Sequence, residues 1–254
     1  MDSLVEGTAT RAMIPCHDPA TGGSLGEVPV MDAGDVRGAV DRAREAQRAW
    51  ARTSFSERRA VLRALLALIV LEQDRIAEVC VRDSGKTLVD AAMGEIFPVC
   101  EKIRWTIRRG ARCLRPERRA SGVLVNKRAE VHYEPLGVVG VIAPWNFPFH
   151  NLYCPLIPAL FAGNGVVVKV SEWTSWSAAP LVRYIHRALF ERGHSPELVQ
   201  IVTGYGETGA ALVRSGAEKI FFTGSPQNGR RVMEAASEGP VPVVLELGGK
   251  DPMI

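Results

Sequence analysis

Residues 138–170 read VVGVIAPWNFPFHNLYCPLIPALFAGNGVVVKV. The segment begins and ends with a short apolar run, at 138–142 and 166–170, and residues 152–161 between them show helical spacing. Strands that are apolar at every position are buried on both faces, as in parallel sheets. The segment therefore predicts a strand–helix–strand unit of an α/β fold.

The same alternation continues toward the end of the chain. Further apolar runs, separated by helical stretches at 175–192, 207–215 and 228–237, lie at residues 198–202, 219–223 and 243–247. This order predicts a Rossmann-like sheet of five parallel strands with helices on both faces. Because such sheets bind ligands beyond the carboxyl ends of their strands, the residues that follow each run are the candidates for function.

Helices are expected ahead of this sheet. The first 35 residues are predicted to be irregular, and helices are predicted over 35–51, 55–83 and 87–109. Ser54 and Glu57 form a capping box at the start of the second helix, and Pro98 should end or kink the third. Residues 122–134 alternate between apolar and polar side chains, which predicts one or two exposed antiparallel strands.

Composition narrows the function classes. The net charge is +3, and nine basic side chains against one acid lie in residues 104–128, which we interpret as a solvated helix end rather than a nucleic-acid site. The longest apolar run has eight residues, whereas a membrane span needs about 20. Five scattered cysteines and no recognisable signal peptide favour a reducing, cytoplasmic location without a metal site.

Polar side chains follow the first two apolar runs. Asn146 lies between Pro144 and Pro148, and a rigidly held amide could donate to a developing oxyanion. The alternative is a buried turn in which the amide is satisfied internally. Lys169 and Glu172 could bind ribose hydroxyls, or they could form an ordinary surface ion pair.

Two glycine-rich turns compete as phosphate sites. Residues 204–209 read Gly-Tyr-Gly-Glu-Thr-Gly, but the dinucleotide fingerprint also requires an acid at the end of the next strand, and none is present. We therefore interpret this segment as a tight turn. Gly224 and Ser225, which open a helix with Pro226 in its first turn, are the better pyrophosphate candidates.

The last apolar run carries a carboxylate. Glu246 lies near the end of a strand that is predicted to be buried, where desolvation would suit a general base. An ion pair with Lys250 is the alternative interpretation. Cys154, on the helix after Asn146, is expected to be a packing residue.

Taken together, the strand ends resemble the aldehyde dehydrogenase superfamily. The matching strings are PWNFP at 144–148, KVSE at 169–172, FTGS at 222–225 and LELGGK at 245–250, in the order of that family. The resemblance covers essentially the whole chain and the N-terminal half of a family member. Two further strings, at 148–151 and 169–177, are most similar to the plant family-22 branch and its bacterial relatives.

The resemblance implies oxidation of an aldehyde to a carboxylic acid. A cysteine thiolate attacks the carbonyl, Asn146 binds the oxyanion, and Glu246 activates the water that releases the acid. Cofactor-binding residues implied in the same way are Ile142, Trp145, Lys169, Glu172, Gly204, Gly224, Ser225, Gly229 and Leu247. A glutamate at position 172 favours NAD over NADP, although NADP is possible, and no metal is implied.

The resemblance also implies a domain organisation. Residues 1–116 would form the helical part of the cofactor-binding domain, 117–136 the strands of a homo-oligomer contact, and 137–254 a dinucleotide-binding core. The family's nucleophilic cysteine lies beyond Ile254, so the chain is expected to be a fragment without a catalytic domain, inactive by itself. Residues near Phe149 and Tyr153 suggest an apolar entrance for a small aldehyde.

Three other functions stay open. The chain could be a non-catalytic module that binds NAD or forms oligomers. It could be a conventional reductase that uses the turn at 204–209. An acylating enzyme that passes its thioester to coenzyme A is disfavoured by the presence of Glu246.

Overall fold

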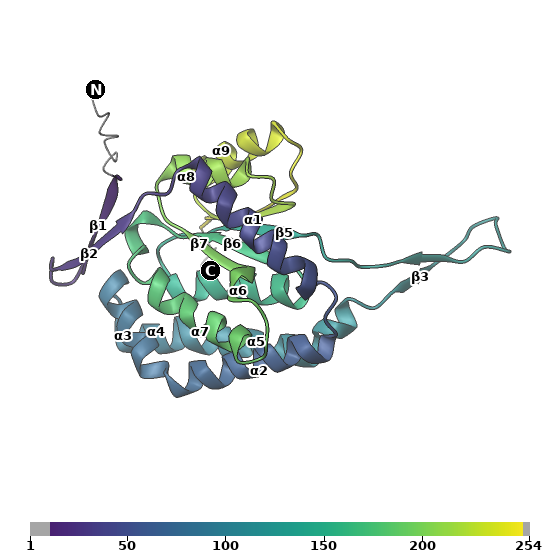
Figure 1. Cartoon of the computed structure of the whole chain (residues 1–254), viewed down its shortest axis with the longest axis horizontal. Coiled ribbons are helices and arrows are strands. Elements are labelled where there is room, and N and C mark those ends of the chain that lie inside the picture. The colour runs from purple at the N-terminus through teal and green to yellow at the C-terminus, as the bar shows by residue number, and fades with distance from the viewer. Residues whose placement is uncertain (1–10, 251–254) are drawn as a thin grey trace, which may run out of the picture.

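The computed structural model describes residues 11–250 and is built around a five-stranded parallel sheet (Figure 1). The strand order is β7-β6-β5-β8-β9, so the chain reverses direction across the sheet between β5 and β8. The strands are β5 (Val138–Ile142), β6 (Gly165–Lys169), β7 (Val199–Val202), β8 (Lys219–Gly224) and β9 (Val243–Leu247). The predicted fold class and parallel sheet are confirmed.

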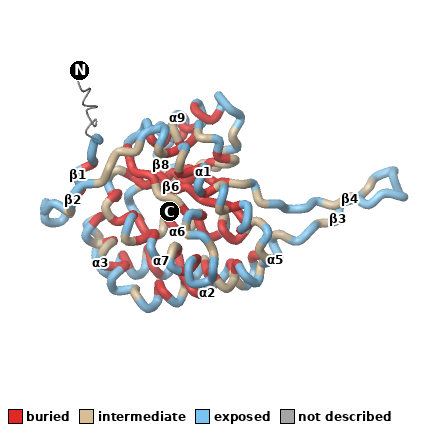
Figure 2. The backbone as a smooth tube through the Cα atoms, viewed as in Figure 1, coloured by how far each residue is buried: buried red, intermediate tan, exposed pale blue. Residues whose placement is uncertain are grey.

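Helices cover both faces of the sheet. The crossover helices are α6 (Pro148–Phe161), α7 (Ala178–Phe190), α8 (Gly206–Val213) and α9 (Pro226–Ser237). One apolar core joins α6 and α7 to α2 (Phe55–Leu71), α3 (Gln73–Ser84) and α5 (Phe97–Cys113), and a second joins α1 (Ala33–Trp50), α8 and α9. Buried residues gather along the sheet in Figure 2.

Alternation along each strand assigns its side chains to one core or the other. Val166 and Val168 of β6 pack into the first core, whereas Val167 packs into the second. By the same alternation, Ile142 and Lys169 face the side of the sheet that α8 and α9 cover. The pleat therefore brings these two strand ends to one site.

The N-terminal helices follow their capping signals. They are α1 (Ala33–Trp50), α2 (Phe55–Leu71), α3 (Gln73–Ser84), α4 (Leu88–Ala91) and α5 (Phe97–Cys113). The Ser54–Glu57 capping box is present at the start of α2, and Gly85 ends α3 in a left-handed conformation.

The single helix predicted over 55–83 is wrong, because the chain breaks at Glu72. This residue has φ −105° and ψ 19°, outside the helical range. A continuous helix would place Glu72 on the same stripe as the buried Leu65, Ile69 and Ile76. The break leaves its carboxylate only half-buried, which avoids the cost of burying an unpaired charge.

The kink expected at Pro98 takes the form of a π-helical turn, η1 (Ala92–Ile96), between α4 and α5. A proline inside a regular helix clashes with the carbonyl four residues earlier, here that of Gly94. The wider π turn relieves this clash, and Pro98 then lies in the first turn of α5.

The prediction that the first 35 residues are irregular is wrong for residues 13–29, and its part at residues 1–10 lies outside the described residues. β1 (Met13–His17) and β2 (Ser24–Pro29) form an antiparallel hairpin. The turn signal at Asp18 lies in its loop, and Ile14 and Cys16 alternate with exposed neighbours in a short half-buried strand.

A second hairpin projects away from the body (Figure 1). Its strands are β3 (Glu117–Arg119) and β4 (Ala129–Val131). The antiparallel pairing is as predicted, but the first strand lies before residue 122, so the alternating Val123 and Val125 fall in the connecting loop. Their side chains are 94% and 91% exposed.

No helix within residues 11–250 combines the length and apolar character that crossing a membrane requires.

Candidate functional site

A cleft lies at the carboxyl edge of the sheet, where ligands of such folds bind. Its cavity volume is about 160 Å³, below the roughly 300–1,000 Å³ usual for a complete small-molecule site, so it can hold only part of a larger ligand. Its floor is formed by Ile142 and Lys169 and its rim by Glu172, and its walls come from α8 and α9. The structure thus brings together three residues that the sequence analysis singled out separately.

Lys169 and Glu172 form the ion pair considered above, but Lys169 is buried, so it is not an ordinary surface pair. The residue is 5% exposed, and its Nζ lies 3.4 Å from Oε2 of Glu172. Burial lowers the pKa of Lys169, and the nearby Glu172 carboxylate offsets part of that shift. An ammonium has three hydrogen-bond donors, and the contact with Glu172 uses one of them. At 3.4 Å this contact is longer than a usual hydrogen bond. The remaining donors can bind a hydroxyl-bearing ligand in the cleft.

The start of α9 has the geometry predicted for a phosphate site. Ser225 is its N-cap, and Ser225 Oγ accepts a hydrogen bond of 3.2 Å from the Asn228 N–H. A Cβ added at Gly224 would lie 2.6 Å from the Phe222 ring, and one at Gly229 would lie 2.8 Å from Leu247. Both glycines therefore allow close packing around this helix start, and their roles toward a cofactor stay predictions.

The competing glycine-rich turn opens α8 and borders the same cleft. Gly204 has φ +156°, and a Cβ there would overlap the Thr208 hydroxyl, which donates a hydrogen bond to the Met31 carbonyl. Gly206 has open space around it and lines the cleft. A larger residue at position 204 would therefore collide with Thr208, whereas position 206 has room for a side chain.

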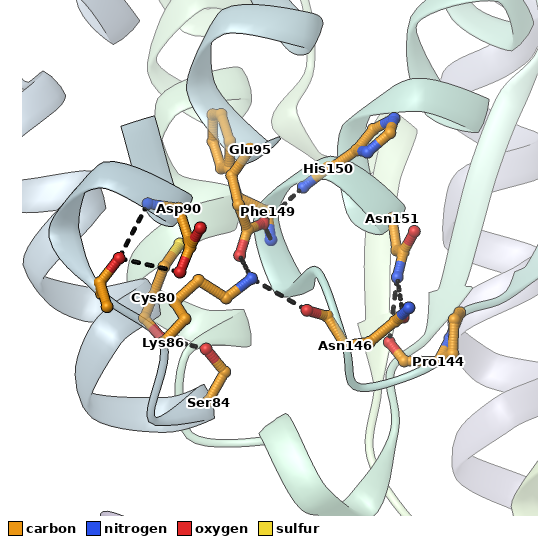
Figure 3. Close-up of polar contacts among 11 residues, drawn as sticks. Cys80, Ser84, Lys86, Asp90, Glu95, Pro144, Asn146, Phe149, His150 and Asn151 are labelled. Carbon is orange, nitrogen blue, oxygen red and sulfur yellow. Dashed lines mark hydrogen bonds and ion pairs between the residues drawn. The ribbon is translucent and has the colours of Figure 1, made fainter. Parts of the chain in front are cut away.

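Asn146 lies on the loop between β5 and α6, and its side chain is exposed rather than sealed in a buried turn. Asn151 Nδ2 donates to Asn146 Oδ1 at 3.0 Å (Figure 3). That contact fixes the oxygen of the amide and leaves its NH2 group without an acceptor among the described residues. Trp145, 54% exposed, lines a neighbouring hollow together with Glu172.

Glu246 departs from its prediction. β9 is the edge strand of the sheet and pairs only with β8. Its residues 243–245 are half-buried, and Glu246 and Leu247 are exposed, so the buried strand expected here is wrong. No ion pair joins Glu246 to Lys250 in the described part of the chain. The carboxylate is therefore accessible at the edge of the sheet.

The apolar entrance suggested by Phe149 and Tyr153 is also wrong. Both side chains are fully buried, and the Tyr153 hydroxyl donates to the Leu181 carbonyl at 2.8 Å. Cys154 is half-buried against the core as predicted, and burial raises the pKa of its thiol to about 11. All five cysteines are free, and no cluster of metal-ligating side chains occurs in residues 11–250.

The sequence model of the aldehyde dehydrogenase family matches residues 5–254. The chain belongs to this family. It is 44% identical to an aldehyde dehydrogenase-like protein of Schizosaccharomyces pombe, an alignment that covers 95% of this chain and 47% of that protein. It is 37% identical to 4,4'-diapolycopene aldehyde oxidase of Methylomonas sp., over 95% of this chain and 45% of that protein.

Solved aldehyde dehydrogenase structures share the fold. A Mycobacterium tuberculosis aldehyde dehydrogenase complexed with NAD+ superposes with a TM-score of 0.85 at 30% identity, covering 96% of this chain and 49% of that one. An E. coli NADP-dependent enzyme gives 0.85 at 35% identity, over 94% and 48%. The chain spans about half the length of these relatives and corresponds to their N-terminal, cofactor-binding half. Its placement nearest the plant family-22 branch stays a prediction.

Sequence reasoning missed two residues beside Asn146 in this aldehyde dehydrogenase chain. Lys86 lies in the loop after α3, and Glu95 lies in the π turn. Their side chains are 11% and 0% exposed, and they form a 2.5 Å ion pair. The available signal was Pro98 inside a helical pattern, because a π turn next to a proline often marks a functional site.

Proposed function

We propose that this chain binds NAD(P)+ in the cleft between α8 and α9, as part of an enzyme that oxidises an aldehyde to a carboxylic acid. The observation that carries the proposal is the buried Lys169 ammonium beside Glu172, where both residues line the cleft at the carboxyl edge of the sheet. The complex of a related aldehyde dehydrogenase with NAD+ supports it.

In this proposal the adenosine ribose binds to Lys169 and Glu172, above Ile142. The pyrophosphate lies at the start of α9, where Ser225 and the free N–H groups of the first turn favour an anion. Gly224 and Gly229 keep this approach open, and the backbone at Leu247 faces the nicotinamide. Gly204 lies in the turn before α8, and Trp145 lines the neighbouring hollow that shares Glu172 with the cleft.

The Glu172 carboxylate favours NAD over NADP. A carboxylate accepts hydrogen bonds from a free ribose 2′-hydroxyl, whereas it repels a 2′-phosphate that carries the same sign of charge. NADP is therefore expected to bind at the same site but more weakly than NAD.

The reaction assigns roles to two side chains outside the cleft. When a thiolate attacks the aldehyde, the free NH2 group of Asn146 donates to the oxyanion that forms. The bound dinucleotide supplies the hydride acceptor. The accessible Glu246 carboxylate then accepts a proton from the water that hydrolyses the thioester.

We infer that the attacking thiol is not among the cysteines described here. Cys154, which follows Asn146 on α6, is held protonated by its raised pKa. Cys16, Cys80 and Cys100 are buried, and a nucleophile must reach its substrate. Cys113 is exposed, but it lies at the end of α5 and does not line the cleft. The chain by itself is therefore expected to bind the cofactor without turning over aldehyde.

The exposed β3–β4 hairpin is the proposed contact of a homo-oligomer.

An assay of the complete gene product tests this function. The proposal predicts that NAD+ and an aldehyde together give NADH and carboxylic acid in equal amounts. NAD binding without turnover of any aldehyde would instead favour a non-catalytic module. Loss of NAD binding on replacing Gly206 with valine, with no effect of Ser225→Ala, would favour a conventional reductase.

A further inference from the structure

The loop that carries Asn146 is fixed by residues from a distant part of the chain. Lys86 Nζ donates to the main-chain carbonyl of Asn146 at 2.9 Å. The same nitrogen lies 4.2 Å from the centre of the Phe147 ring, a cation–π contact. One ammonium, 60 residues earlier in the sequence, therefore holds both the amide residue and its neighbour (Figure 3).

Glu95 fixes the other end of this loop. Its Oε2 accepts hydrogen bonds from the N–H groups of Phe149 at 2.7 Å and His150 at 3.0 Å. These donors belong to the first turn of α6, where N–H groups have no partner within the helix. The local N-cap, Phe147, provides no side-chain hydrogen bond. Glu95 thus replaces a local cap and sets where α6 begins.

The π turn brings these contacts into place. A Cβ at Gly94 would lie 2.8 Å from the Phe147 ring, so the ring packs directly on the backbone of η1. The next residue, Glu95, points its carboxylate between Lys86 and the start of α6 (Figure 3). A regular helix through this segment would rotate Glu95 relative to Gly94, because π and α turns differ in residues per turn.

We propose that Lys86 and Glu95 are positioning residues that hold the Asn146 amide where the aldehyde oxyanion forms. The inference rests on the proposed oxidation. Lys86 fixes the main chain at Asn146, Glu95 fixes the helix that follows, and Asn151 on that helix orients the amide oxygen. The NH2 group then points away from these partners, preorganised for a developing negative charge.

A double-mutant cycle in the complete gene product tests the proposal. Lys86→Met is expected to lower kcat/KM for aldehyde by about 10²-fold, the effect of losing one oxyanion donor, and to leave the Kd of NAD unchanged. Asn146→Ala should show a similar loss. The double variant should lose no more than Asn146→Ala alone, because Lys86 acts through Asn146. Losses that multiply would overturn the proposal.

Arg58→Met is the matched control. Arg58 is another buried cation that donates to main-chain carbonyls, of Phe161 at 3.0 Å and Ala51 at 2.9 Å, at the far end of α6. It should lower the Tm without lowering kcat/KM of the folded enzyme, and an equal loss of kcat/KM would contradict a specific role for Lys86. Lys86→Arg, which keeps the charge, should recover part of the rate. Where Lys86→Met does not fold, Glu95→Gln replaces it in the cycle.

A measurement without turnover separates this inference from the proposed function. The side-chain amide of Asn146 gives a pair of NMR cross-peaks that are identified by their absence in Asn146→Ala. These peaks should move toward the positions of a freely solvated asparagine in Lys86→Met and stay in place in Arg58→Met. Unchanged peaks in Lys86→Met would overturn the positioning role, whether or not the enzyme oxidises an aldehyde.

Discussion

The Lys169 ammonium is buried, and the loss of hydration destabilises its charged form in the folded protein. Burial lowers its pKa in the folded protein, so the unfolded chain holds this proton more tightly. Between the two pKa values the unfolded state carries more protons, and the contribution of Lys169 to stability therefore rises with pH toward the ordinary lysine value of about 10.4.

The first prediction concerns Lys169→Met. In the absence of cofactor this variant should not lower the Tm, and its stability should lose the rise with pH that Lys169 contributes below the ordinary lysine pKa of about 10.4. Its Kd for NAD should increase about tenfold, since a hydrogen bond from a charged donor is lost. Thermal unfolding and calorimetric titration measure the two effects. Lys219→Met is the control and should leave NAD binding unchanged, because Lys219 lies at the opposite edge of the sheet, at the start of β8.

The second prediction concerns Glu172→Gln. It should tighten NADP binding relative to NAD by about tenfold, because the repulsion of the 2′-phosphate is removed. Glu207→Gln removes the same charge from α8, at a residue that does not line the cleft, and should change this ratio little. Equal effects of the two variants would mean that only the overall charge of the region matters.

Functional side chains at the ends of strands could be predicted from the sequence. Those whose role depends on contacts with distant residues could not. Lys169 lies at the end of an apolar run, and Asn146 and Glu172 follow such runs within four residues, which marks all three in the sequence. Lys86 and Glu95 acquire their roles from partners 54 to 60 residues away, and no local pattern encodes such partners.

Two helical glycines differ in how closely neighbouring atoms approach them. Gly110 of α5 is buried, and a Cβ there would lie 2.5 Å from the Phe161 ring. Gly38 of α1 would place its Cβ only near the end of the Arg42 side chain, at 3.4 Å. Gly110 is therefore needed for a close contact between helices, whereas Gly38 only lowers the helix propensity of α1.

The third prediction follows from this difference. Gly110→Ala should lower the free energy of unfolding by about 1–3 kcal/mol, because a packed aromatic ring cannot move aside freely. Gly38→Ala should raise it by about 0.5–1 kcal/mol. Urea denaturation of both variants checks the pair. A stabilising Gly110→Ala would show that α5 and α6 can separate at this contact without cost.

At the scale of elements, the capping box of Ser54 and Glu57 predicted the start of α2, and the structure confirms it. The helix predicted from residue 35 begins earlier, at Ala33, because Asp32 is its N-cap. The break at Glu72 and the β1–β2 hairpin were missed because each depends on burial against the rest of the fold.

For the whole molecule, the projecting hairpin is the feature that the body of the fold does not explain. Val123 and Val125 at its tip are almost fully exposed, which is unfavourable for a surface with no partner.

The fourth prediction concerns the assembly. The double substitution Val123→Asp and Val125→Asp should shift the complete gene product toward smaller species in analytical ultracentrifugation, with an unchanged Tm for the sheet. The same change at Val131, which is less exposed and lies within β4, should also weaken the hairpin itself. An unaltered assembly would remove the hairpin from the subunit contact.

The parallel sheet was predictable because five apolar runs and their intervening helices reflect the same layered architecture. The exposure of β9 was not, because only the sheet order identifies an edge strand. That order also places the cofactor cleft, where α8 and α9 meet the ends of β5 and β6.

A crystal structure with NAD+ tests the central claim most directly. The account predicts the adenosine ribose within hydrogen-bond distance of Lys169 and Glu172, with the pyrophosphate at the start of α9 near Ser225. A dinucleotide seated on the turn at residues 204–209, with its ribose away from Lys169, would contradict it.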